Sequence, residues 1–320
     1  PDAARRQSRL GSLYASPAER QLPLAEESCT RLPGAGKLRF CNSGTEATML
    51  AIGLARHVTR KYKILKMEGG YHGSHDGLQI SIKPALEKAG PVNRPFSVPE
   101  TPGIPPDVID MCVVAPFNNT RVTEKIIVEN HQELAAVIVE PVLGAAGMIP
   151  PETGFLEMLR ATADKYGILL IFDEVLTFRL SKGGCQELYR IVPDLTALGK
   201  MIGGGFPVGA LAGTNELLKH FVPNTPGFFG HSGTFNGNPV TMTAGLATLG
   251  ELTATEIERI NHLGKKMRVG LRQILDQLAI SARVTGAGSL AQVHFTRSGV
   301  RAVSYTHLTL PTIRRGWGGR

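Results

Sequence analysis

Short apolar runs alternate with amphipathic stretches along most of the chain. The runs that read as strands lie at residues 38–41, 63–67, 111–115, 135–139 and 168–172. Between them, residues 47–58, 120–132 and 155–166 repeat apolar positions every three or four residues, as a helix with one buried face does. The run 168–172 is apolar throughout, which is typical of a strand at the centre of a parallel sheet. The alternation predicts an α/β fold with a mostly parallel central sheet flanked by helices.

The pattern changes near residue 255. A long amphipathic helix is predicted for residues 256–278, and residues 284–295 read as the start of a new β-containing unit. The apolar stripe of the helix consists of Ile260, Leu263, Met267, Leu271, Ile274, Leu275 and Leu278. We therefore expect a large domain over residues 1–255 and an incomplete small C-terminal domain over residues 256–300.

Both ends of the chain depart from this pattern. Residues 1–25 are polar and basic with little periodicity, so we expect a loop or the remnant of a helix there. The first residue is Pro1 rather than Met, and we expect the native N-terminus to be missing. Residues 301–320 follow no helical or strand period and resemble translated adapter sequence, so we expect a non-native tail.

Composition narrows the class of protein. The 320 residues are 42% hydrophobic and 19% charged, and no apolar run approaches the ~20 residues that cross a bilayer. The net charge of +8 would suit a nucleic-acid partner, but half of it comes from arginines in residues 301–320, which contain no acid. We expect neither a membrane nor a nucleic-acid partner. The four cysteines form no CxxC pair, which indicates reduced thiols in a cytoplasmic protein.

Small polar residues follow the first predicted strand. In residues 42–47, NSGTEA, Ser43 and Glu46 have the spacing of a capping box, which marks the start of a helix. A strand, a tight turn and a helix N-terminus direct backbone N–H groups at one spot, which suits an anion. A plain capped helix explains the segment equally well.

Two nucleotide-binding motifs are excluded. Residues 34–37 suggest a P-loop, but Arg31 and Leu38 occupy the positions that need glycine and a hydroxyl residue. No GxGxxG motif opens a helix, so a Rossmann-type dehydrogenase lacks its phosphate fingerprint.

Residues 68–77, EGGYHGSHDG, follow the second predicted strand. His72, His75 and Asp76 suggest a metal, but no further cluster has metal-ligand spacing and a glycine-rich loop positions ligands poorly. We therefore expect no metal. Tyr71 lies near the carboxyl end of a strand and is better interpreted as a cover over a planar ligand.

Two charged residues stand in unusual settings. Asp173 directly follows the apolar run 168–172, where a buried carboxylate needs a cation or a ligand, and ligands in open α/β sheets bind at such strand ends. A structural ion pair is the alternative. Lys200 precedes a triple glycine in residues 198–205, LGKMIGGG, where the backbone lets a large ligand approach. Such an amine can attack a carbonyl, and an ordinary exposed loop lysine is the alternative.

One chemistry uses an anion site, an aromatic ring, a carboxylate and a reactive lysine together, and that is pyridoxal 5′-phosphate catalysis. The lysine forms an imine with the cofactor aldehyde, and the carboxylate keeps the pyridine nitrogen protonated. The helix terminus holds the phosphate. The sequence therefore predicts pyridoxal 5′-phosphate as the cofactor.

The same motifs carry a resemblance to a known family. Residues 32–290 resemble the class III aminotransferases, which are fold-type-I pyridoxal phosphate enzymes, and most closely the subgroup that includes glutamate-1-semialdehyde 2,1-aminomutase. The matching motifs are 42–47 (NSGTEA), 70–73 (GYHG), 140–141 (EP), 173–175 (DEV), 198–200 (LGK), 203–205 (GGG) and 233–239 (GTFNGNP). The resemblance implies amino-group transfer on a small amino acid or amino aldehyde.

The resemblance also implies a role for each residue around the cofactor ring. Lys200 is then the Schiff-base lysine and the proton shuttle, and Asp173 pairs with the pyridine nitrogen. Tyr71 stacks on one face of the ring and Val175 packs on the other.

The phosphate site implied by the resemblance consists of Ser43, Gly44 and Thr45. Thr234 resembles the residue that reaches the phosphate site of a neighbouring subunit. The resemblance therefore implies a homodimer.

The sequence departs from the family pattern in two places. Ala145 stands five residues after Glu140, where many class III enzymes have glutamate and aminomutases tend to have asparagine, which disfavours a typical ω-amino-acid or ornithine-type enzyme. Residues 173–179 are one residue shorter than the usual aminomutase pattern and resemble some β-amino-acid transaminases. We expect an aminotransferase that acts on a small amino acid. Glutamate-1-semialdehyde 2,1-aminomutase, or a catalytically incomplete fragment of either enzyme, is the alternative.

Overall fold

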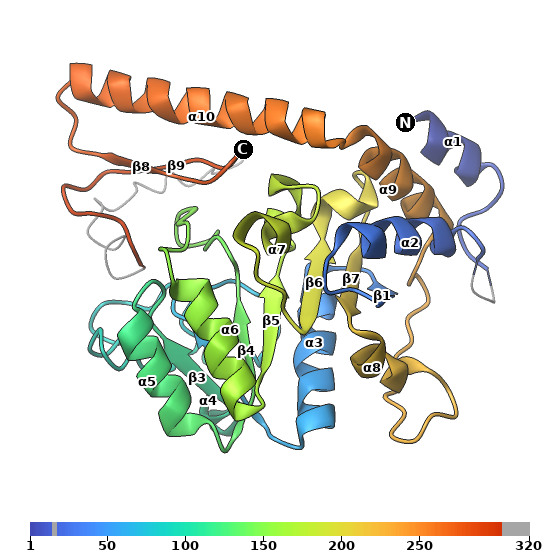
Figure 1. Ribbon diagram of the computed structural model, residues 1–320, viewed down its shortest axis with the longest axis horizontal. Helices are drawn as coiled ribbons and strands as arrows, with labels where there is room; N and C mark the ends of the chain where they lie inside the picture. The colour runs from blue at the N-terminus through green and yellow to red at the C-terminus, as the bar shows by residue number, and fades with distance from the viewer. Residues whose placement is uncertain (15–17, 303–320) are drawn as a thin grey trace, which may run out of the picture.

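A seven-stranded sheet forms the centre of the molecule (Figure 1). The computed structural model describes residues 1–14 and 18–302. The strands are β1 (Lys37–Cys41), β2 (Lys63–Met67), β3 (Cys112–Ala115), β4 (Leu134–Val139), β5 (Leu169–Asp173), β6 (Leu195–Gly199) and β7 (Gly209–Gly213). Their order across the sheet is β1-β7-β6-β5-β4-β2-β3. β7 runs antiparallel to both of its neighbours, and the other pairs are parallel.

Every strand that the apolar runs predict is present, and the mostly parallel α/β sheet is confirmed. β5 extends to Asp173, so the carboxylate belongs to the last residue of the strand. β6 and β7 lie on either side of Lys200, and neither strand was among those predicted from the sequence.

Helices cover both faces of the sheet (Figure 1). α5 (Thr120–Asn130) and α6 (Phe155–Tyr166) pack on one face, and α3 (Gly44–Thr59) packs on the other. Side chains alternate between the two faces of a strand. Phe172 of β5 lies in the core beneath α6, whereas its neighbour Ile171 lies in the core beneath α3. Because both faces of β5 are covered, its positions are apolar without alternation.

Shorter elements connect these layers. They are α4 (Pro106–Asp110), α7 (Gly184–Tyr189), α8 (Asn215–Leu218) and the 3-10 turns η1 (Thr177–Leu180), η2 (Lys200–Gly203) and η3 (Lys219–Phe221). None of the helices in the described ranges combines the length and apolarity that crossing a bilayer requires.

The N-terminal segment is partly helical, which agrees with the helical one of the two alternatives expected for it. Residues 1–25 contain α1 (Asp2–Ser8) and the start of α2 (Gln21–Arg31). α2 packs against α9 (Pro239–Glu251), and its buried positions include the polar residues Ser28 and Arg31. Arg31 donates hydrogen bonds to backbone carbonyls at the end of α9. The sequence left loop and helix open here because the buried face of α2 is partly polar and leaves no apolar period.

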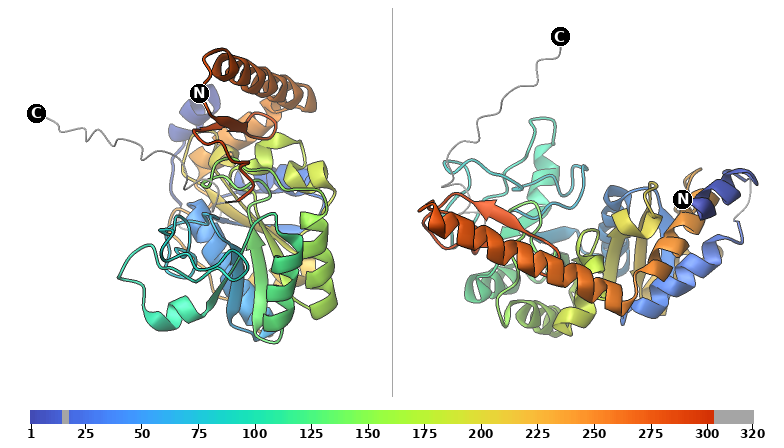
Figure 2. Two further views of the ribbon diagram at one scale, coloured as in Figure 1. Left: turned by 90° about the vertical axis from the view of Figure 1, so that its left-hand side faces the viewer. Right: turned by 90° about the horizontal axis from the view of Figure 1, so that it is seen from above.

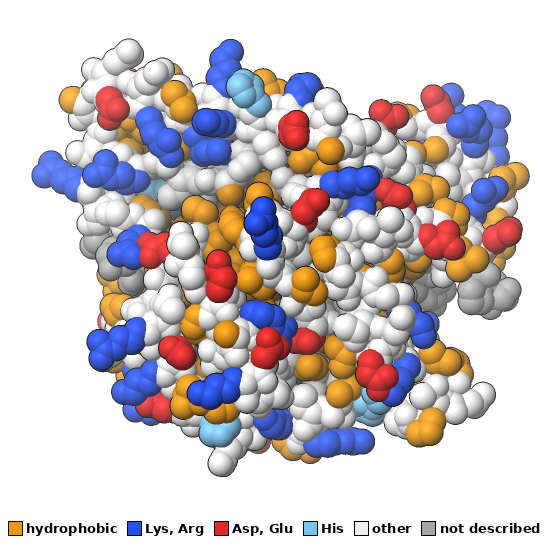
Figure 3. Space-filling model, in the orientation of Figure 1, with side chains coloured by type: hydrophobic (Ala, Val, Ile, Leu, Met, Phe, Trp, Pro, Cys, Tyr) orange, Lys and Arg blue, Asp and Glu red, His pale blue; other side chains and the backbone are white. Residues whose placement is uncertain are grey.

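The predicted long helix is α10 (Ala254–Gln277), which lies across the top of the molecule in Figure 1 and in the left-hand view of Figure 2. A hairpin of β8 (Arg283–Thr285) and β9 (Gln292–His294) follows it, where the sequence predicted only β structure. Much of the apolar stripe is exposed: Met267 is 50% exposed and Leu278 is 64% exposed. Figure 3 shows basic side chains along α10 and hydrophobic side chains gathered below it.

The division into a large domain and a small domain near residue 255 stays a prediction. Of the expected tail, the structure describes only residues 301 and 302, and residues 303–320 lie outside the described part. Arg301 forms an ion pair with Glu152.

Candidate active site

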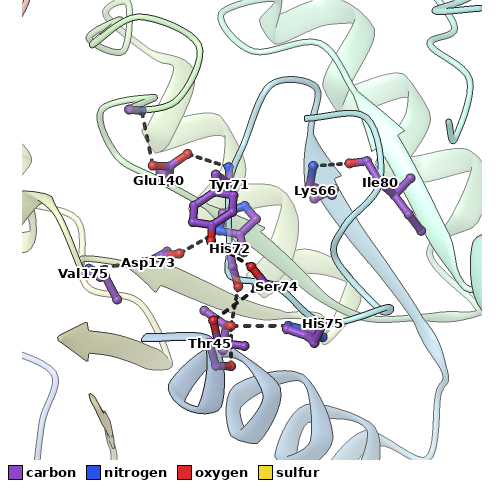
Figure 4. Close-up of polar contacts among 12 residues, drawn as sticks. Thr45, Lys66, Tyr71, His72, Ser74, His75, Ile80, Glu140, Asp173 and Val175 are labelled. Carbon is purple, nitrogen blue, oxygen red and sulfur yellow. Dashed lines mark hydrogen bonds and ion pairs between the residues drawn. The ribbon is translucent and has the colours of Figure 1, made fainter. Parts of the chain in front are cut away.

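The polar motifs meet at one edge of the sheet because parallel strands present their carboxyl ends on the same side. Figure 4 shows this edge, with Tyr71 following β2, Glu140 following β4 and Asp173 ending β5. Thr45, in the first turn of α3, lies below them. Residues separated by more than a hundred positions in the sequence are thus brought together.

The predicted capping box is present at the start of α3. The Ser43 hydroxyl accepts a hydrogen bond from the Glu46 N–H at 3.1 Å, and the Glu46 carboxylate accepts one from the Asn42 N–H at 2.5 Å. The N–H groups of Gly44 and Thr45 have no acceptor within the helix, since first-turn amides never do. They remain able to donate to an anion, and the positive end of the helix dipole favours one.

Glycines keep side chains out of this corner. A Cβ at position 44 would lie 3.0 Å from the Val175 side chain, and a Cβ at position 199 would lie 3.3 Å from it. Gly73 has a φ of +99°, and a Cβ there would lie 2.6 Å from Thr45 Oγ1. The turn before α3, the turn after β5 and the end of β6 therefore touch one another through glycines packed around Val175.

Tyr71 is held at both its backbone and its hydroxyl. Its N–H donates to Glu140 Oε2 at 2.9 Å, and its hydroxyl is 3.1 Å from Ser74 Oγ. The N–H of Ser74 in turn donates to Thr45 Oγ1 at 3.1 Å. Tyr71 is 42% exposed, so part of its surface remains open to a ligand at the sheet edge.

Asp173 is buried and has a partner for each carboxylate oxygen. Oδ2 accepts a hydrogen bond from His72 Nδ1 at 2.8 Å, and Oδ1 accepts one from the Val175 N–H at 3.1 Å. Burial lowers the pKa of His72. The imidazole is therefore neutral near pH 7 and brings no positive charge to the Asp173 carboxylate.

Two further buried charged groups surround the pair. Glu140 accepts hydrogen bonds from the N–H groups of Tyr71 and Gly144, while burial and then the charge of Asp173 raise its pKa. Lys66 in β2 donates to the Ile80 carbonyl, and burial lowers its pKa to about 8. Sequence reasoning missed Lys66, although a lysine within an apolar strand run is a signal of a buried charge.

Lys200 immediately follows β6. Its φ is +46°, in the left-handed region, and its side chain is exposed. A residue other than glycine in that region carries roughly 1–2 kcal/mol of backbone strain, and such strain is often retained at functional sites. The exposure fits the alternative of a loop lysine, whereas the strained backbone and its place beside Gly199 favour a functional role.

Thr234 lies apart from the other predicted residues. It is exposed in the loop before α9 and lines a cavity of about 920 Å³, whose lining includes none of the other predicted site residues. Arg39 fixes this loop by donating to His231 Nδ1 at 3.1 Å and to the His231 carbonyl at 2.6 Å. Asn236 of the same loop is 2.8 Å from the Asn42 side chain. The loop is thus tied to the residue that precedes the capping box.

Comparisons with known proteins agree on one family. The model of the aminotransferase class-III family matches residues 3–310. Glutamate-1-semialdehyde 2,1-aminomutase of Methanosphaera stadtmanae is 44% identical over 295 residues, which are 92% of this chain and 67% of the relative. The chain therefore spans about two thirds of the length of that relative.

Two solved structures resemble the fold closely. An ω-transaminase from Sphaerobacter thermophilus is 41% identical with a TM-score of 0.91, and the match covers 98% of this chain and 70% of the other. A β-phenylalanine aminotransferase from Variovorax paradoxus is 34% identical with a TM-score of 0.84, over 96% and 67% of the two chains. The family uses pyridoxal 5′-phosphate. The chain belongs to the class III aminotransferases, pyridoxal-phosphate-dependent enzymes of the α/β fold described above.

Proposed function

We propose that the protein moves an amino group on a small amino acid or amino aldehyde, with pyridoxal 5′-phosphate bound at the carboxyl edge of the sheet. The observation that carries this proposal is the packing of Gly44 and Gly199 around Val175. This packing supports the proposal because it brings the start of α3, the turn after Asp173 and the end of β6, which Lys200 follows, into contact. That set provides an anion site, a fixed negative charge and an amine, and it fits the cofactor.

The residues after β1 would hold the phosphate. Ser43 caps α3 and leaves the N–H groups of Gly44 and Thr45 to donate to the phosphate oxygens. Thr45 Oγ1 accepts from the Ser74 N–H, so its own proton is free to point at the anion.

The remaining residues would hold the ring and move the proton. Tyr71 and Val175 would cover its two faces and exclude water, and the Asp173 carboxylate would accept a hydrogen bond from the protonated ring nitrogen and so keep the proton there. Bound pyridoxal phosphate supplies an aldehyde that takes up amines and a ring that accepts electrons from carbon. Lys200 Nζ is the group that removes and returns the proton on the substrate carbon.

A homodimer is part of this proposal. Thr234 lies on a cavity that contains none of this chain's other predicted site residues, so it would serve the phosphate site of a second copy. The cytoplasmic location expected from the unpaired cysteines is likewise a proposal.

The substrate is the finer part of the proposal. Ala145 is exposed in the loop after Glu140 and carries no polar group toward a substrate. The shorter segment after Asp173 resembles that of some β-amino-acid transaminases, and one similar structure is named a β-phenylalanine aminotransferase. We favour transfer between two substrates, whereas the 44% identical relative favours the aminomutase reaction.

Substrate requirements separate these two reactions. An aminomutase converts glutamate-1-semialdehyde without a second substrate, whereas a transaminase needs an amino donor and an oxo-acid acceptor. We expect the purified protein to require both a β-amino acid or amine and an oxo acid for turnover, and the Lys200→Ala variant to be inactive. Turnover of glutamate-1-semialdehyde alone would favour the aminomutase, and no turnover of either kind would contradict the proposed function.

A further inference from the structure

The contact between His72 and Asp173 joins two buried side chains from different strands. His72 follows β2 and is 1% exposed, whereas Asp173 ends β5 and is 4% exposed. His72 Nδ1 lies 2.8 Å from Asp173 Oδ2. An ionised carboxylate only accepts hydrogen bonds, so the proton of the neutral imidazole must be on Nδ1.

The other ring nitrogen of His72 lies in a place that disfavours a second proton. Nε2 is buried and has no hydrogen-bond partner in the described part of the chain. A Cβ at position 70 would lie 2.9 Å from Nε2, so the backbone of Gly70 closes that side. The charges facing the imidazole are Asp173 and Lys66, of which only Asp173 favours protonation. Protonation would leave a buried N–H without an acceptor, which is costly.

The neutral state of His72 determines the charge that Asp173 presents. A positively charged arginine or lysine partner would offset the charge of the carboxylate. The carboxylate would then stabilise a proton on a neighbouring group less strongly. A neutral donor orients the carboxylate and leaves the pair with a full negative charge. The backbone of His72 is fixed as well, because Thr48 of α3 donates to its carbonyl at 2.5 Å.

We propose that His72 is a positioning residue that acts through Asp173, orienting the carboxylate so that it holds a proton on the ring nitrogen of the cofactor. The inference rests on the proposed function, since it takes Asp173 as the partner of the ring. His72 does not touch the substrate in this arrangement. Its loss should therefore alter the ionisation of the ring rather than remove the reacting lysine.

Three substitutions separate the donor from the volume of the side chain. In His72→Asn the amide nitrogen takes the place of Nδ1 and still donates to Asp173. In His72→Gln the amide nitrogen lies where Nε2 was, so no donor faces Asp173. His72→Leu has no hydrogen-bond donor in its side chain. Removing a hydrogen bond to a charged group should weaken cofactor binding about 10–100-fold in the Gln and Leu variants, with little change in the Asn variant.

The direct measurement is the ¹⁵N chemical shift of pyridoxal phosphate labelled at its ring nitrogen and bound to each variant. We expect a protonated ring nitrogen in the wild type and in His72→Asn, and a loss of protonation in His72→Gln and His72→Leu. Circular dichroism checks folding, and the Asn and Gln variants decide the question if the Leu variant misfolds. A protonated ring in the folded Gln variant, or equal loss in Asn and Gln, would overturn the inference.

Asp173→Asn distinguishes this failure from failure of the proposed function. If the wild type holds no cofactor, or if Asp173→Asn leaves the ring protonated, the role of Asp173 is wrong. If Asp173→Asn removes the ring proton while His72→Gln keeps it, the role of Asp173 stands and that of His72 falls.

Discussion

At the scale of single residues, Lys200 is distinguished by its backbone. The left-handed φ of +46° at the end of β6 turns the chain sharply before the glycines that follow. A strained conformation that a glycine would adopt more easily is occupied here by a lysine. The position therefore requires the side chain, which is the argument for its chemical role.

Covalent trapping tests that role. Adding pyridoxal phosphate and then borohydride should attach the cofactor irreversibly to Lys200, because it directly follows Gly199, which packs against Val175 at the proposed ring site. Mass spectrometry of a digest identifies the modified residue, and Lys200→Ala serves as the control. Modification of a different lysine in folded protein would show that Lys200 is an ordinary loop residue.

His75 carries the clearest pH dependence. Burial, followed by the charges of His72 and Arg56, lowers its pKa to about 4 from an ordinary value of 6.5. The folded state thus binds the proton less tightly than the unfolded state, so the stabilisation is complete above pH 6.5 and is lost as pH falls toward 4. We expect the free energy of unfolding in urea to decrease less between pH 7 and 4.5 in His75→Gln than in the wild type.

The control for this prediction is His262→Gln, which changes an exposed histidine of α10. It should follow the wild-type pH profile. An identical acid dependence in the wild type and in His75→Gln would refute the predicted contribution of His75.

Part of the site could be predicted from residue types. The capping box of Ser43, the strand-end position of Asp173 and the unusual setting of Lys200 are visible in the sequence. The partner of Asp173 is not visible in the sequence, which suggested His72 only as a metal ligand. The contact between His72 and Asp173 depends on how β2 and β5 are spaced across the sheet. The sequence does not show which distant side chain meets a buried carboxylate.

At the scale of secondary-structure elements, the start of α3 has two functions. Its cap satisfies first-turn amides of the helix, and the same turn forms the proposed phosphate site. Stability and cofactor binding are therefore coupled at Ser43.

Ser43→Ala should lower both quantities. Loss of an N-cap costs about 0.5–2 kcal/mol of unfolding free energy, and the loosened turn should weaken cofactor affinity as well. Thr253→Ala is a matched control, since Thr253 caps α10 through the Glu256 N–H but lies outside the proposed site. Denaturant unfolding and cofactor titration measure the two effects. Equal cofactor affinity in both variants would contradict the assignment of the phosphate site.

Helices and strands with an apolar period could be predicted from the sequence. An element whose buried face is partly polar could not. The strands β2, β4 and β5 coincide closely with their apolar runs, since both faces are covered by helices. α2 was left open between loop and helix because Arg31 and Ser28 occupy its buried face, where Arg31 donates hydrogen bonds to the end of α9. Tertiary hydrogen bonds of this kind leave no period in the sequence.

At the scale of the whole molecule, α10 presents an uncovered apolar face. Leu263, Met267 and Ile274 are each about half exposed. Exposed apolar surface of this kind favours association and dye binding.

The chain should therefore bind a hydrophobic fluorescent dye while showing the circular dichroism of a folded α/β protein. Replacing Leu263 and Met267 together by lysine should reduce the dye signal without loss of helix content. The double variant Leu22→Lys with Tyr62→Lys, which changes exposed apolar residues on other elements, is the control. A wild-type chain that binds no dye would show that this face is covered, for example by a second copy.

The strand order has a consequence for the synthesis of the protein. Within the described residues, β1 lies at the edge of the sheet and pairs with β7 alone, whose residues leave the ribosome roughly 170 positions later. At about 5–20 residues per second, the nascent chain carries an unpaired β1 for roughly 10–30 s. The proposed phosphate-binding turn, although encoded near the start of this sequence, is therefore among the last parts of the large sheet to take shape.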